Sequence, residues 1–91
     1  MKTITIDLSV CNTYADIHLL LKRELDFPAF YGENLDALWD CLTGFIMIPV
    51  TVVFRGMDRM PARLRQDMRE KFLPVFYEAE HEGHGVYVVV E

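Results

Sequence analysis

The first residues of the chain alternate polar and apolar side chains, a period-two pattern that predicts a strand with one buried side. In residues 2–8, threonine and aspartate alternate with isoleucine and leucine. Two later runs, residues 50–54 and 86–90, are almost entirely apolar and rich in valine. Their length and composition favour short buried strands. We therefore expect three strands, with Pro49 at the entry of the second.

Two helices are predicted between the first two strands. Thr13 begins the first helix, because its side chain can cap the helix and Asp16 follows three residues later, as in a capping box. Asn34 can cap the second helix, and Gly44 is expected to end it in the left-handed conformation. The apolar positions of the first helix recur at helical spacing up to a stop before Pro28, and they are Ile17, Leu20, Leu21 and Leu25.

Two more helices are predicted between the second and third strands. Residues 58–82 have a helical pattern, in which Pro61 suits a first turn. Pro74 removes an interior N–H, so we expect it to kink or split this segment. Gly83 and Gly85 then end the last helix.

This order of elements indicates an α/β fold with a small three-stranded parallel sheet and about four helices packed against it. Helical segments between short apolar strands imply right-handed crossovers. A central first strand would let both neighbours be reached in this way, so we expect the strand order 2-1-3. Because 91 residues leave room for one modest core, we expect a single domain over residues 1–91.

Charge is segregated along a chain whose net charge is −5. Six of the nine Lys and Arg residues fall within residues 55–71, whereas residues 24–54 and 72–91 contain none. An acidic surface speeds the encounter with a basic protein and disfavours nucleic acid on that face. RNA binding through the basic segment is an alternative, but acidic residues interrupt this segment and it has no aromatic residue for stacking. We interpret it as a solvated helix face.

Other function classes find little support in the sequence. The two cysteines, Cys11 and Cys41, are too few and too widely spaced for a disulfide framework, so we expect reduced thiols in a cytoplasmic protein. No apolar run has the length of a membrane span, and the start does not resemble a secretory signal. Residues 81–84, HEGH, have the wrong spacing for a zinc motif, and we interpret His18 as structural. We expect no metal, no cofactor and no enzymatic activity.

The helix predicted for residues 34–44 carries two aspartates, Asp36 and Asp40, on the side away from its apolar stripe. Like charges one turn apart cost a few tenths of a kcal/mol in an isolated helix, so folding alone does not call for this pair. The stripe consists of Leu35, Leu38 and Leu42. A hydrated acidic face is the simplest interpretation of this pattern by itself.

A second acidic pair, Glu78 and Glu82, has the same spacing near the end of the last predicted helix. Trp39 lies at the border of the leucine stripe, and Phe45 follows the acidic helix. Large aromatic residues usually belong to the core. If these two are partly exposed beside the carboxylates, the surface combines aromatic anchors with charge, as tight protein interfaces do.

The stretch YGENLDALWDCLTG, residues 31–44, closely resembles the barstar family of intracellular ribonuclease inhibitors, and ADIHLLLKRELDFPAF and VFYEAEHEG extend the resemblance more weakly. The resemblance implies a barstar-like fold, a cis Ile48–Pro49 bond, and a 1:1 complex between a monomer and a small basic extracellular ribonuclease. The second helix and the preceding loop would cover the nuclease active site. The residues that the resemblance implies as contacts are Phe30, Gly32, Asn34, Leu35, Asp36, Trp39, Asp40, Thr43, Gly44, Phe45, Glu78 and Glu82.

By position, Asp40 matches the family's aspartate that occupies the site of a substrate phosphate. Carboxylates can satisfy the Lys, Arg and His side chains of a ribonuclease without offering a bond to cleave. The chain departs from the family pattern at three positions: Phe30 replaces a tyrosine, Phe45 replaces a tryptophan, and His84 replaces a frequent cysteine. An alternative hypothesis keeps the fold but assigns the acidic face to another basic protein, without ribonuclease inhibition.

Overall fold

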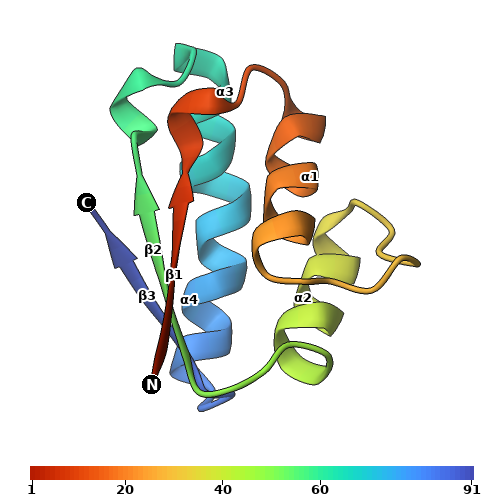
Figure 1. The fold of residues 1–91 in the computed structure, drawn as a ribbon. Helices are drawn as coiled ribbons and strands as arrows, with labels where there is room; N and C mark the ends of the chain where they lie inside the picture. Colours follow the sequence, from red (N-terminus) through yellow and green to blue (C-terminus); the bar gives the residue numbers. More distant parts are fainter.

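Three parallel strands form the sheet in the computed structural model, which describes residues 1–91 (Figure 1). The strands are β1 (Lys2–Asp7), β2 (Val50–Arg55) and β3 (Val86–Val90). β2 pairs with both neighbours, so the strand order is 1-2-3 and the expected order 2-1-3 is wrong. Both right-handed crossovers therefore advance in the same direction, which places the helices on one face of the sheet. In the order 2-1-3, the two right-handed crossovers would run in opposite directions along the sheet. Their helices would then cover both of its faces.

The two helices before β2 begin at the predicted caps. α1 (Tyr14–Glu24) has a complete capping box, in which the Asp16 N–H donates to Thr13 Oγ1 at 3.1 Å and the Thr13 N–H donates to Asp16 Oδ2 at 3.0 Å. α2 (Leu35–Gly44) is capped by Asn34. Its expected left-handed end at Gly44 is wrong, because the helix continues through Gly44 and ends at Phe45 with φ of −123°.

Residues 62–81 form one continuous helical body, so of the expected kink or split at Pro74 the split is wrong, and three helical bodies replace about four. α3 (Ala62–Asp67) and α4 (Leu73–His81) are joined by a π-helical turn, Met68–Phe72. The Leu73 N–H bonds to the Met68 carbonyl five residues earlier. This shift in the hydrogen-bond register occurs immediately before Pro74. Because the regular α-helical hydrogen bonds are already interrupted there, the missing N–H of Pro74 costs little stability. Gly83, with φ of 77°, follows the end of α4.

The core is one cluster of 23 buried residues between the sheet and the helices. Phe54 of β2 and Phe76 of α4 meet edge to face within this cluster, with ring centroids 5.0 Å apart.

Both cysteines are buried free thiols, and burial raises the pKa of Cys11 to about 11. The Ile48–Pro49 peptide bond is cis, as expected. None of the helices combines the length and apolar character that crossing a membrane requires.

A candidate protein-binding surface

α2 presents Asp36 and Asp40 to solvent because its opposite side is fixed in the core. Leu38, Cys41 and Leu42 are buried, and Leu35 packs against the core at its edge. The two aspartates are exposed, and neither takes part in an ion pair. The helix therefore offers two uncompensated carboxylates on a rigid support.

The start of α2 is held by Asn34. Its Oδ1 accepts a hydrogen bond from the Ala37 N–H at 2.8 Å, and its Nδ2 donates to the Gly32 carbonyl at 3.2 Å. One side chain thus caps the helix and ties it to the preceding loop. Glu33, which lies between Gly32 and Asn34, adopts a left-handed backbone with φ of 51° and turns the chain sharply into the helix.

Trp39 connects the acidic helix to the end of α4. Its half-buried ring meets the ring of His84 edge to face, with centroids 5.5 Å apart. His84 Nε2 lies 3.7 Å from Glu82 Oε1. This chain of contacts brings α2 and Glu82 onto one surface. Glu78 is exposed one turn earlier on α4, and no hydrogen bond or ion pair joins its side chain to α2.

Two exposed phenylalanines border α2, one in the loop before it and one directly after its last residue. Phe30 is 71% exposed and Phe45 is 55% exposed, and their rings meet edge to face with centroids 5.4 Å apart. Their contact joins the loop before α2 to the residue that follows it. Thr43 uses its hydroxyl within the helix, donating to the Trp39 carbonyl at 2.8 Å, and the Cβ position of Gly44 faces open space.

The loop before α2 is anchored to α1 by a buried pair, Tyr31 and His18, that the sequence pattern did not reveal. Tyr31 is 5% exposed, and its hydroxyl lies 2.6 Å from Nδ1 of His18, which is 1% exposed. Burial lowers the pKa of His18 and raises the pKa of Tyr31, so both groups are neutral near pH 7. His18 is structural, as expected, but its partner lies 13 residues away, and no local pattern indicates the pair.

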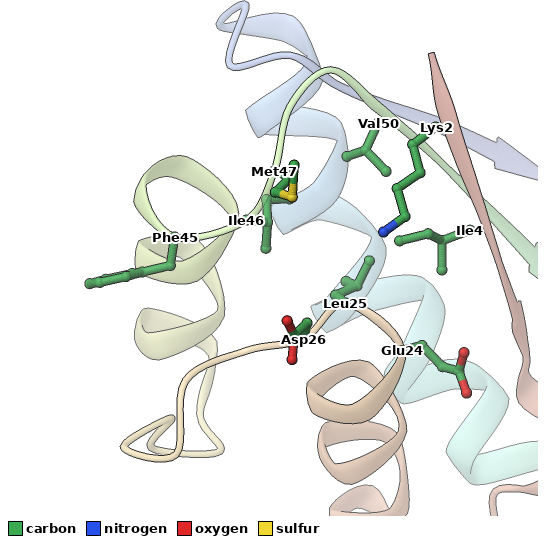
Figure 2. A pocket seen from close by; sticks show the side chains of 9 residues that line it. All are labelled: Lys2, Ile4, Glu24, Leu25, Asp26, Phe45, Ile46, Met47 and Val50. Carbon is green, nitrogen blue, oxygen red and sulfur yellow. The ribbon is translucent and has the colours of Figure 1, made fainter.

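None of the main pockets of the structure is lined by Asp36, Asp40, Glu78 or Glu82. Figure 2 shows a pocket of about 70 Å³ where the start of β1, the end of α1 and the loop after α2 meet. Phe45 borders this pocket, but its ring points away from the enclosed space. The pocket is lined by Lys2, Ile4, Glu24, Leu25, Asp26, Phe45, Ile46, Met47 and Val50. An exposed surface that carries aromatic and acidic groups suits a protein partner better than a small molecule, which binds in a larger concave pocket.

The basic segment, residues 55–71, is partly neutralised by its own surroundings. Arg55 forms an ion pair with Glu91 at 2.7 Å, and Lys71 forms one with Asp67 at 3.5 Å. Arg65 donates to a backbone carbonyl at 3.2 Å. These internal contacts agree with a solvated face.

The predicted contact residues thus occupy α2, the loops that flank it, and the end of α4. A family model described as Barstar (barnase inhibitor) matches residues 1–91. A protein of Bacillus subtilis (strain 168) named "Putative ribonuclease inhibitor YrdF" is 47% identical over 58 residues, which cover 64% of this chain and 64% of that protein. The match thus spans slightly less than two-thirds of that relative. Because the family model covers the whole length, the chain belongs to the barstar family of barnase inhibitors.

Proposed function

We propose that this chain inhibits a small basic ribonuclease by covering its active site with an acidic surface. This surface consists of the exposed side of α2, the Phe30–Gly32 loop and the end of α4. The observation that carries the proposal is the pair Asp36 and Asp40, which are exposed and free of ion pairs on a helix fixed in the core. Membership of the barstar family supports the same role.

Asp40 occupies the centre of the proposed contact. A ribonuclease gathers cationic side chains to stabilise the charge of the phosphate, and a carboxylate can accept charge-assisted hydrogen bonds from them. Asp36 lies one turn earlier on the same helix, and Glu78 and Glu82 extend the negative charge along α4. The bound inhibitor offers charge in place of the substrate without offering a bond to cleave.

Aromatic side chains supply the apolar part of the contact. Trp39 lies between the two aspartates in sequence, and its ring is held by His84. Phe30 and Phe45 form an exposed pair at the rim, at the two positions where the resemblance to the barstar family implies tyrosine and tryptophan. We propose that this smaller, hydroxyl-free pair adjusts the surface to the shape of its own partner nuclease. Asn34, Leu35, Thr43 and Gly44 complete the contact.

The proposed inhibitor acts by binding alone. It needs no cofactor and catalyses no reaction, and one copy binds one nuclease. We further propose that it acts in the cytoplasm, where it protects the cell from a ribonuclease made for export. Two buried thiols without a disulfide suit a reducing compartment.

The experiment is a titration of RNA cleavage by a barnase-like ribonuclease. Cleavage is expected to fall linearly and to stop at one inhibitor per enzyme, and association is expected to slow as salt is added. Full cleavage at a several-fold molar excess of inhibitor would refute the proposal for that enzyme. Binding measured by calorimetry without loss of cleavage would favour the alternative, an interaction domain for a basic protein.

A further inference from the structure

β3 leaves one edge of the sheet without a partner strand. It pairs with β2 on one side only, and in Figure 1 it lies at the border of the sheet far from α2. The strand consists of valines and one tyrosine, and Tyr87, Val89 and Val90 are 45%, 44% and 38% exposed. An edge strand made only of uncharged, largely apolar residues is a template for pairing with another chain. β1 at the opposite edge carries Lys2 and Asp7 instead.

A carboxylate from α4 occupies the middle of this free edge. Oε2 of Glu80 accepts a hydrogen bond from the Val88 N–H at 2.9 Å. The Gly85 carbonyl and the Glu91 N–H both bond to β2, so the odd-numbered residues of β3 direct their backbone groups to the neighbouring strand. The even-numbered residues, Val86, Val88 and Val90, direct theirs to the free edge. Val88 is the central one.

We propose that Glu80 prevents β3 from pairing with β3 of a second copy of this chain. Antiparallel pairing about a twofold axis at Val88 would place Val88 opposite its own copy and Val86 opposite Val90. These are the residues whose backbone groups face the edge, so both kinds of pair would be hydrogen-bonded pairs. Tyr87 would lie opposite Val89. The free edge is thus complementary to itself in backbone and in side chains.

Glu80 opposes this pairing in two ways. Its carboxylate already holds the Val88 N–H, which is the donor at the centre of the twofold arrangement. In addition, two Glu80 carboxylates would meet near the axis and repel each other. A second copy of this chain is the partner that β3 favours. The apolar side chains of β3 provide no charge that would give preference to a different peptide. Inward-reaching charges of this kind are a known protection of sheet edges.

The experiment compares the mass in solution of the full chain and of Glu80→Ala by sedimentation velocity over a concentration series. The wild type is expected to stay at 10.6 kDa, and Glu80→Ala is expected to approach twice that mass as concentration rises. We expect its dimer to form at a concentration at least ~10-fold lower than any wild-type dimer. Glu70→Ala, at an exposed site on the π-helical turn, removes the same charge and should stay monomeric.

Two further variants link any dimer to this edge. Val90→Lys in the Glu80→Ala background should restore the monomer, because a lysine at the edge would be buried by the pairing. Glu80→Gln keeps a hydrogen-bond acceptor and should dimerise more weakly than Glu80→Ala, which also covers the case in which Glu80→Ala does not fold. Circular dichroism checks folding. Monomeric Glu80→Gln together with monomeric or unfolded Glu80→Ala would overturn the proposal, as would a dimer that survives Val90→Lys.

Discussion

Replacement of Tyr31 by phenylalanine tests the anchor beneath the proposed binding loop. The substitution removes only the hydroxyl that lies 2.6 Å from His18 Nδ1. The ring keeps its contacts with Phe27 and His18, whose centroids lie 4.8 and 5.7 Å away. The change therefore isolates one buried hydrogen bond.

The expected cost follows from what the substitution leaves behind. His18 is 1% exposed, and its other ring nitrogen, Nε2, already has no hydrogen-bond partner. Without the phenol, both polar atoms of the imidazole are buried and unpartnered. A buried polar group that loses its partner costs about 1–3 kcal/mol. Each kcal/mol lowers the melting temperature of a domain of this size by about 4–8 °C, so Tyr31→Phe should melt at least ~4 °C lower.

Urea unfolding gives the free energy and thermal unfolding gives the melting temperature, each followed by the fluorescence of Trp39, the single tryptophan. Tyr14→Phe is the matched control, because the ring of Tyr14 also packs against His18, at 5.2 Å, but its hydroxyl makes no hydrogen bond. We expect the control to change the free energy of unfolding by less than about 0.5 kcal/mol. Equal effects of the two substitutions would refute the reasoning, since the hydrogen bond would then contribute nothing beyond a generic loss of a hydroxyl.

Three further predictions concern stability. Asn34→Ala removes the cap of α2 and should lower the free energy of unfolding by about 1 kcal/mol in urea titration, and an unchanged midpoint would contradict this role. Because burial lowers the pKa of His18 below its ordinary 6.5, the unfolded chain binds this proton more readily. Stability should therefore fall as the pH decreases from 7 to 5, and a rise measured over that window by urea unfolding would contradict the account. Gly56→Ala should destabilise by more than about 1 kcal/mol in thermal unfolding, because Gly56 has φ of +73° and a Cβ would lie 3.0 Å from the Ser9 N. A melting temperature equal to that of the wild type would contradict this expectation.

Most of the fold was predictable because its signals are local. Alternation in β1, the capping box at Thr13 and the cap at Asn34 each involve residues within a few positions of one another. The strand order is a property of the whole chain, although one clue to it was present. The polar residues of β1 imply a sheet with a solvated face, and only the order 1-2-3 leaves that face free of helices.

The candidate site likewise combines features that short stretches of sequence predict with contacts that they do not. Spacing on a helix and the family resemblance identified Asp36 and Asp40, because both depend on short stretches of sequence. The contacts that assemble the surface join residues far apart in the chain, as in the ring contact of Trp39 with His84. Likewise, the missing N–H of Pro74 predicted a kink or a split, and the π-helical turn that keeps the helix continuous there has no clear sequence pattern. Such features depend on tertiary packing, which periodicity does not describe.

The most direct test of the central claim is the inhibition of a barnase-like ribonuclease by Asp40→Ala, with Asp58→Ala as the matched control. Both substitutions remove one exposed aspartate, but Asp58 lies in the basic segment away from α2. Loss of the charge-assisted hydrogen bonds that Asp40 accepts should weaken inhibition by about 1.5–3 kcal/mol, or roughly 10- to 150-fold. The account predicts that the wild type and Asp58→Ala have the same inhibition constant and that the inhibition constant of Asp40→Ala is larger by this factor. Equal inhibition constants for Asp40→Ala and Asp58→Ala would contradict it.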